Sequence, residues 1–283
     1  MNKKVAAVVV LYNPDKNYIK NINTYLYHIS LLVIVDNSEI PDYSVYSSLE
    51  NINHVKFVIN KENTGISKAI NDGIKLAVKE GAEWVLTMDQ DSFFENNMIE
   101  NYLVAFNEIS NNKKVAVIGP VSEKRSDETI PTKIKEVTSL ITSGSLINTS
   151  IFSEVGGYNE KLFIDEVDHE YCYRIKMLGY SVLQVENIFL NHTLGSQQPV
   201  KTLTGKKKVK TLHSPIRLYY IVRNCCFIIK MYKKQFPEEI KLRRKDLAVR
   251  IKNNLLYGPK KFSLIKHILL GFVHFKRKRF GKL

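Results

Sequence analysis

The stretch VLTMDQDS, residues 85–92, joins an apolar run to two carboxylates. The run predicts a buried strand, and Asp89 and Asp91 share one side of it because side chains alternate along an extended chain. Two carboxylates at a strand end suit Mg²⁺ or Mn²⁺, which bind carboxylates together with substrate phosphates. Solvated loop acids, or acids that cap the next helix, would explain the same two residues, so this stretch alone leaves both interpretations open.

Apolar runs that end in polar residues recur along the first part of the chain. Strands are expected over residues 5–11, 31–35, 55–59 and 84–88, and apolar residues at helical spacing occupy residues 18–29 and 63–78. This alternation predicts an α/β fold with an open, mostly parallel sheet. Ligands of such sheets bind beyond the carboxyl ends of the strands. Tyr12, Asp36 and Asp89 fall at that edge.

The alternation is less regular after residue 110. We expect a strand over 115–119, a polar loop over 121–131, a strand over 137–147 broken at 143–145, a helix within 163–178, short strands over 181–185 and 188–191, and helices from Pro215 to the end. The sequence therefore predicts a first domain of residues 1–213 and a helical C-terminal extension of residues 214–283.

The charge of the chain is concentrated near its C-terminal end. The formal net charge is +14, and the excess of lysine and arginine lies after residue 200. Such an excess indicates an anionic partner, which is a nucleic acid, an anionic membrane surface or a phosphorylated substrate. The apolar stretch 262–275 is too short to span a bilayer.

The cysteines and the N-terminus favour a cytoplasmic protein. Of Cys172, Cys225 and Cys226, the last two are adjacent, so a disulfide framework is not expected and a reducing compartment fits best. The first residues become polar after a short apolar run, which predicts a strand rather than a signal peptide.

A second acidic group follows at residues 165–170. It contains Asp165, Glu166, Asp168 and Glu170, and apolar spacing predicts that its later part is helical. Acids at a helix N-terminus are favourable through the helix dipole, so capping explains part of the group. A carboxylate held close to an acceptor hydroxyl would act as a general base.

Seven segments together carry a resemblance to a known family. They are VVVLYN (8–13), VDNS (35–38), ENTGISKAIN (62–71), MDQDS (88–92), TSGS (142–145), FIDEVDHE (163–170) and NHTLG (191–195). In this order and spacing the chain resembles family 2 glycosyltransferases of the GT-A fold, most closely the rhamnosyltransferases of bacterial surface polysaccharide synthesis. The resemblance implies an α/β fold with a Rossmann-like, mixed but mostly parallel sheet flanked by helices. The resemblance covers about residues 5–225.

The resemblance implies a nucleotide-sugar site with a metal ion. It assigns the pyrimidine base to Tyr12 and Asp36, the border of the nucleoside to Asn63, Gly65 and Lys68, the ribose and the metal to Asp89 and Asp91, and a third metal ligand to His192. Each assignment has a structural alternative: an edge aromatic for Tyr12, a turn-forming acid for Asp36, a solvated helix residue for Lys68, and a hydrogen-bonded structural histidine for His192.

The resemblance also assigns the acceptor side. Asp168 matches the general base, Glu170 matches the acid that positions the acceptor, and Gly144 and Ser145 match an acceptor-side turn. The residue before Asp168 is Val167, where many family members have an acid, so Glu166 or Asp165 is an alternative base. Arg217, Arg223 and Asn224 resemble a segment that follows the catalytic domain, for which diphosphate contact and helix packing are equal alternatives.

The implied reaction is an inverting transfer of a sugar, dependent on Mg²⁺ or Mn²⁺. The resemblance implies rhamnose from dTDP-rhamnose as the donor, with galactofuranose, glucose or another hexose as alternatives, and a polyprenyl-diphosphate-linked glycan as the acceptor. The basic extension would then lie on the anionic inner face of the plasma membrane, or else pack on the catalytic domain or another subunit.

Two other kinds of protein remain as alternatives. A nucleic-acid-binding module explains the charge but not the two acidic groups, because acids repel phosphate unless a metal intervenes. A hydrolase or nucleotidyltransferase that acts on a diphosphate is the second alternative.

Overall fold

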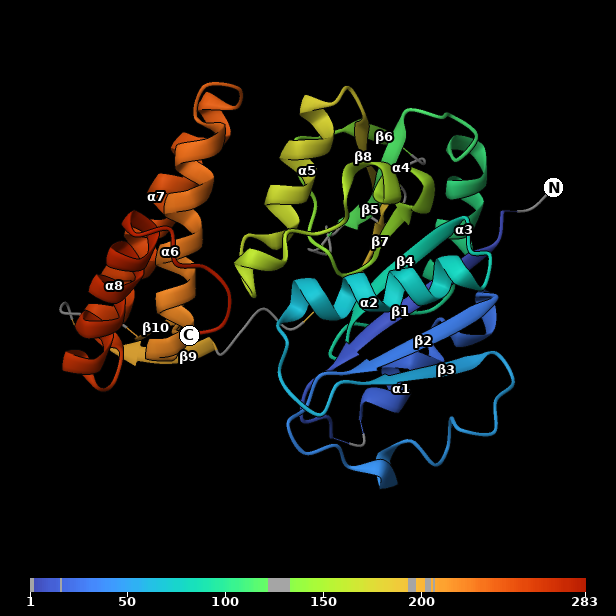
Figure 1. Cartoon of the computed structure of the whole chain (residues 1–283), viewed down its shortest axis with the longest axis horizontal. Helices are drawn as coiled ribbons and strands as arrows, with labels where there is room; N and C mark the ends of the chain where they lie inside the picture. The colour runs from blue at the N-terminus through green and yellow to red at the C-terminus, as the bar shows by residue number, and fades with distance from the viewer. Residues whose placement is uncertain (1–2, 16, 122–132, 193–196, 202–204, 206) are drawn as a thin grey trace. The chain divides into compact units, whose positions relative to one another are not determined.

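A computed structural model describes residues 3–15, 17–121, 133–192, 197–201, 205 and 207–283 (Figure 1). Most of the predicted loop 121–131, and residues 193–195 of the NHTLG segment, lie outside the described residues. The chain forms two compact units. The sheet unit contains Met1–Glu160 and Asp168–His192, and the C-terminal unit contains Lys161–Val167 and Thr193–Leu283. The functional roles predicted for residues 1–213 and 214–283 stay predictions.

The sheet unit is built on a mixed, mostly parallel sheet. Its strands are β1 (Val5–Leu11), β2 (Leu31–Asp36), β3 (Val55–Ile59), β4 (Trp84–Asp89), β5 (Val115–Val121), β6 (Ile134–Glu136), β7 (Ser145–Asn148) and β8 (Ser181–Phe189). They are ordered β3-β2-β1-β4-β7-β5-β8-β6. The pairs of β1 with β2 and β4, of β2 with β3, and of β5 with β8 are parallel, whereas β7 is antiparallel to both of its neighbours. The predicted α/β sheet is confirmed.

The register of the central strands aligns their carboxyl ends. Leu11 of β1 lies opposite Asp36 of β2, and Val10 lies opposite Asp89 of β4. The residues that follow these strands therefore meet at one edge of the sheet, as expected for a parallel α/β fold.

The helices of this unit cover the sheet. They are α1 (Tyr18–Asn23), α2 (Ile66–Lys79), α3 (Met98–Ile109), α4 (Thr149–Val155) and α5 (Val167–Met177), with short 3₁₀ helices at Leu26–His28, Tyr43–Val45 and Glu160–Leu162. Helix α2 lies close against β1 and β2 (Figure 1), because Gly73 has no side chain. A Cβ atom at Gly73 would lie 2.5 Å from Val8 Cγ1 and 2.9 Å from Val35 Cγ2.

Three predicted elements differ from the structure. The helix expected over 18–29 ends at Asn23 and is followed by a 3₁₀ turn. The strand expected over 137–147 is not continuous: β6 ends before this range and β7 begins only at Ser145, after the chain turns at Gly144, which has a φ of 79°. The two strands expected over 181–185 and 188–191 form the single strand β8, because the Glu186 N–H donates to Lys133 O and the pairing continues through this polar position.

In the described part of the C-terminal unit, three helices accompany a pair of antiparallel strands. The helices are α6 (Pro215–Tyr232), α7 (Pro237–Tyr257) and α8 (Lys261–Lys276), and the antiparallel strands are β9 (Gln197–Lys201) and β10 (Lys207–Thr211). The expected helical extension is confirmed. Helix α6 packs against both α7 and α8 (Figure 1) through an apolar core that includes Leu218, Val222 and Leu264. Within the described residues, no helix is both long enough and apolar enough to cross a bilayer.

Candidate active site

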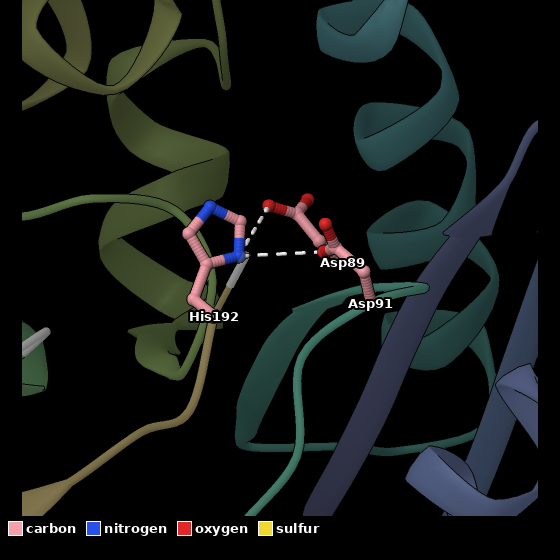
Figure 2. Close-up of side chains that lie close together, drawn as sticks. All are labelled: Asp89, Asp91 and His192. Atoms are coloured by element: carbon pink, nitrogen blue, oxygen red, sulfur yellow. Dashed lines mark ion pairs between the residues drawn. The ribbon is translucent and has the colours of Figure 1, made fainter. Parts of the chain in front are cut away.

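The carboxylates of Asp89 and Asp91 lie beside the imidazole of His192 (Figure 2). Strand β4 ends at Asp89, and His192 arrives from the end of β8 because Asn191 and Phe93 exchange two backbone hydrogen bonds of 3.0 Å. The His192 Nδ1 atom lies 3.3 Å from Asp91 Oδ1 and 3.9 Å from Asp89 Oδ2. The sheet thus brings His192 beside the two neighbouring acids Asp89 and Asp91, from which it is distant in the sequence.

Three side chains that the sequence did not single out form hydrogen bonds in and around this group. The Ser92 hydroxyl lies 2.8 Å from His192 Nδ1, and the Ser143 hydroxyl accepts a 3.1 Å hydrogen bond from the Asp89 N–H. Gln90, which lies between the two acids in the sequence, accepts a 2.8 Å hydrogen bond from the Tyr12 N–H. Their only signal in the sequence is their position next to a motif residue.

The three side chains suit a divalent ion. Each of Asp89, Asp91 and His192 offers one ligand atom, and these atoms lie within 4.8 Å of one another. Ligand atoms around an octahedral ion lie roughly 3 to 4 Å apart when metal–ligand distances are about 2.1 Å, so a small adjustment would close the observed group on an ion. Two carboxylates and an imidazole are suitable ligands for a hard or borderline divalent cation.

Asp36 lies at the end of β2 and is completely buried. Its Oδ1 atom accepts the Ser38 N–H at 2.7 Å, whereas its buried Oδ2 atom has no hydrogen-bond partner among the described residues. Burial, and then the charge of Asp36, raises the pKa of Tyr18 to about 12. Tyr12, on the neighbouring strand end, is 43% exposed, so its ring is open to a ligand.

The loop before α2 is organised by Asn37, another residue without an assigned role in the sequence. Its side-chain carbonyl accepts hydrogen bonds from the Thr64 N–H at 3.0 Å and the Thr64 hydroxyl at 2.8 Å. Asn63 accepts the Gly65 N–H at 3.0 Å, and Gly65 has a φ of 86° that favours glycine. The third predicted residue here, Lys68, forms an ion pair with Asp72, one turn along α2, at 2.8 Å.

Asp168 lies in the first turn of α5, and its side chain is 23% exposed. Its Oδ1 atom accepts the His169 N–H at 2.8 Å. The segment 139–143 contacts both α5 and the end of β4: Ser139 Oγ lies 3.0 Å from His169 Nδ1, and Ser143 accepts a hydrogen bond from the Asp89 N–H. One short segment therefore lies between the two acidic groups.

Glu170 and Ser145 are largely buried and have structural contacts. Arg174 donates to both oxygens of Glu170, at 3.0 and 3.1 Å, and its guanidinium also donates to the carbonyl oxygens of Val155 and Gly157. The Ser145 hydroxyl donates to Ile141 O at 2.6 Å. Their predicted roles toward the acceptor stay predictions.

Gly144 combines an unusual backbone with close packing. Its φ is 79°, and a Cβ atom there would lie 2.8 Å from Pro120 Cγ and 2.9 Å from Leu190 Cδ2. Its N–H donates to Thr87 O at 2.7 Å. A residue with a side chain is therefore disfavoured at this position for two separate reasons.

Asp165 and Glu166 are not part of the helix. Their φ angles of 61° and 64° are left-handed, and α5 begins only at Val167. Within the C-terminal unit, Asp165 lies 3.3 Å from an Arg217 guanidinium nitrogen, and Glu166 lies 3.6 Å from one of Arg243. These contacts give both acids a structural explanation.

Comparison with known proteins assigns the family. The profile of "Glycosyl transferase family 2" matches residues 8–182. The chain is 28% identical over 302 aligned residues to dTDP-rhamnosyl transferase RfbF of Shigella flexneri, with 95% of this chain and 94% of the relative covered. The chain belongs to glycosyl transferase family 2, and its sequence is similar to that of a rhamnosyltransferase.

Solved structures show the same fold. The S. aureus TarS fragment 1-349, in complex with UDP-GlcNAc, superposes with a TM-score of 0.62 at 16% identity, covering 98% of this chain and 81% of that one. GalNAc-T7 with UDP, GalNAc and Mn²⁺ superposes with a TM-score of 0.61 at 14% identity, covering 98% of this chain and 56% of the longer one. The protein is thus a glycosyltransferase with the GT-A fold and C-terminal helices.

Proposed function

We propose that this glycosyltransferase transfers rhamnose from dTDP-rhamnose to a lipid-linked glycan, with inversion at the anomeric carbon, in bacterial surface polysaccharide synthesis. The observation that carries the proposal is the grouping of Asp89, Asp91 and His192 at the carboxyl edge of the sheet. The donor rests on the similarity to the Shigella rhamnosyl transferase. Galactofuranose, glucose and other hexoses are the competing sugars.

The strand ends supply the proposed nucleotide site. The buried Asp36 Oδ2 atom lacks a described partner and would accept the imide N–H of a thymine base, while the exposed Tyr12 ring would lie against the base. Asn63, Gly65 and Lys68 would border the nucleoside. For Lys68 this requires release from Asp72, an ion pair of the helix surface that is worth at most about 1 kcal/mol.

The proposed cofactor is Mg²⁺ or Mn²⁺, held by Asp89, Asp91 and His192. Bound there, it would supply electrostatic stabilisation of the charge on the leaving diphosphate, a contribution of several kcal/mol. Asp89 would also contact the ribose. The Mn²⁺ in the structurally similar GalNAc-T7 supports the choice of a divalent ion.

Asp168 is the proposed general base. It would accept the proton of the acceptor hydroxyl as that oxygen attacks the anomeric carbon from the side opposite the diphosphate. It lies in the first turn of α5, with its side chain partly exposed. Glu170, Gly144 and Ser145 are proposed to shape the acceptor side, in which Glu170 acts while bound to Arg174.

The test of this proposal separates binding from chemistry. Nucleotide sugars are screened with Mn²⁺ for protection against thermal unfolding, and dTDP-rhamnose is expected to protect most. Asp168→Asn should keep this protection and lose about 10²- to 10⁴-fold in turnover. Glu154→Gln, which changes an exposed acid of α4, is the control and should keep both. Unchanged turnover in Asp168→Asn would exclude Asp168 as the base, and diphosphate release without an acceptor would favour a hydrolase.

Helix α8 is the proposed membrane contact. The structure divides its apolar residues into two faces: Leu264 and Ile268 are buried in the helical core, whereas the exposed side carries Phe262, Ile265, Leu269, Phe272 and Val273. Exposed cations flank this stripe at Lys260, Lys261, Lys266, Lys276, Arg277, Lys278 and Arg279. The side chain with the largest exposed fraction in this stripe is Phe262, at 92%. An apolar stripe with flanking cations fits an anionic lipid surface, at roughly 1 kcal/mol per cation.

Point variants test the membrane proposal better than a deletion, because the buried face of α8 belongs to the core. Phe262→Ser with Leu269→Ser should reduce binding to vesicles that contain anionic lipid and leave donor protection unchanged. Leu256→Ser, which removes an exposed apolar residue of α7, is the matched control. Equal vesicle binding by all three proteins would refute a membrane role for the stripe.

A further inference from the structure

The residues just before helix α5 have an unusual backbone. Phe163, Asp165 and Glu166 have φ angles of 67°, 61° and 64°, in the left-handed region that residues with side chains rarely adopt. Each such residue costs about 1 kcal/mol or more, and this backbone persists only where surrounding groups hold it.

Two adjacent side chains of α6 hold this segment. Arg223 and Asn224 are both fully buried. The Asn224 amide donates to the carbonyl oxygens of Leu162 at 2.8 Å, Ile164 at 2.6 Å and Asp165 at 3.1 Å. The Arg223 guanidinium donates to Leu162 O at 2.9 Å and also contacts Lys161 O at 3.4 Å. Backbone carbonyls that no regular helix or strand satisfies are thus satisfied by two side chains.

The C-terminal residues complete the same cluster. The Gly281 N–H donates to Lys161 O at 2.8 Å, and Gly281 O accepts from Arg223 at 2.7 Å. The guanidinium carbon of Arg223 lies 5.3, 5.0 and 5.5 Å from the ring centroids of Tyr219, Tyr220 and Phe280. Gly281 therefore contacts both Arg223 and the segment 161–166, and Phe280 packs against the Arg223 guanidinium.

Packing alone does not account for this arrangement. Burying an arginine and an asparagine is costly unless their donors are satisfied, and apolar side chains would join two helices at a lower cost. Within the described residues, the hydrogen bonds of the Arg223 guanidinium all go to neutral oxygens, most of them backbone carbonyls. Arg223 and Asn224 are therefore suited to hold the backbone of residues 161–166 in one conformation, and not to form an ion pair.

We infer that Arg223 and Asn224 are positioning residues for glycosyl transfer. They hold residues 161–166 in the conformation from which α5 starts, and Asp168 lies in the first turn of that helix. Neither side chain acts on substrate; their effect reaches Asp168 along the chain, which is two residues beyond Glu166. This inference rests on the proposed function of Asp168 as the general base.

The test compares Asn224→Ala with Ile268→Ala. Both remove side-chain contacts in the core of the C-terminal unit, but only Asn224 contacts the segment 161–166. Asn224→Ala should lower kcat by about 10- to 100-fold, because small misplacements of a reacting group have effects of this size, and leave the donor KM within about twofold. Hydrogen exchange should become faster at the amides of residues 162–168. Ile268→Ala should lose stability with little change in kcat.

A second variant covers the case in which Asn224→Ala does not fold. Truncation after Arg279 removes the Gly281 contacts and the Phe280 ring, and it should lower kcat and speed exchange at the same amides. Lys282→Ala is its control, because Lys282 is exposed and the variant keeps the Gly281 backbone. Wild-type kcat in folded Asn224→Ala or in the truncated protein would overturn the inference, as would an equal kcat loss in Ile268→Ala. Asp168→Asn is measured in parallel: its full activity would refute the proposed function instead.

Discussion

Replacing Asp91 by asparagine is expected to change stability in opposite directions with and without a divalent ion. The ligand atoms of Asp89, Asp91 and His192 lie within 4.8 Å of one another. Two carboxylate charges at 4.8 Å repel by about 0.9 kcal/mol in water and about 3.5 kcal/mol at an effective dielectric constant of about 20. Because the two acid side chains are 35% and 45% exposed, the value in water is the better guide. Without metal, Asp91→Asn should therefore stabilise the protein by about 1 kcal/mol, which is about 2 °C in Tm.

With metal, the same substitution should destabilise the protein. An ion at a hundredfold excess over its Kd stabilises wild type by about 2.7 kcal/mol, or about 5 °C. Loss of one charged ligand that weakens binding about a hundredfold leaves about 0.4 kcal/mol of this gain. Even with the 1 kcal/mol of relieved repulsion, the variant would then be less stable than wild type by about 1.3 kcal/mol.

Thermal unfolding in EDTA and in a Mn²⁺ titration measures both effects. The pH should be near 8.5, well above the ordinary histidine pKa, so that imidazolium does not offset the repulsion. Asp246→Asn, which removes an acid of α7 that is paired with Arg250, is the control and should keep the full Mn²⁺ response. An Asp91→Asn protein that is less stable than wild type in EDTA, yet responds to Mn²⁺ like wild type, would refute the metal site.

Three further predictions concern other parts of the chain. Arg174→Met should lower the free energy of unfolding by about 3 kcal/mol, because it leaves the buried Glu170 carboxylate without its ion pair, and urea unfolding measures this loss. Gly144→Ala should destabilise by more than Gly156→Ala, since both glycines have positive φ but only Gly144 is closely packed; equal losses would contradict the packing argument. Burial lowers the pKa of His213 to about 4, so its stabilising effect is complete above pH 6.5 and is lost as the pH falls toward 4; His213→Gln should show a smaller loss of stability than wild type between pH 7 and pH 5.

Local apolar patterns were sufficient to predict the central sheet. The runs that end at Leu11, Asp36 and Asp89 form adjacent parallel strands, because a strand buried on both faces must be apolar throughout and must end where polar residues begin. The predicted meeting of Tyr12, Asp36 and Asp89 at one edge follows from parallel pairing alone. The pattern was less informative at β8, where the polar residues Glu186 and Asn187 separate two expected strands. The structure forms one strand there, and its register against β5 shifts between Gln184 and Phe189.

Spacing along one helix could not show which partner each face would meet. The apolar stretch 262–275 does not show by itself which of its residues a neighbour will cover, whereas the structure buries Leu264 and Ile268 and exposes Phe262 and Leu269. A hydrophobic pattern indicates which residues avoid water, but the position of a neighbouring helix decides which of them are covered.

Patterns along the chain were enough to predict the α/β class, the strand ends and the family to which the chain belongs. They could not show that Asp165 and Glu166 precede α5 instead of opening it, or that Arg223 and Asn224 satisfy carbonyl groups about 60 residues away in the chain. Strand and helix periodicity arises between neighbours in sequence, whereas the left-handed backbone within residues 163–166 is held by side chains that are distant in the sequence.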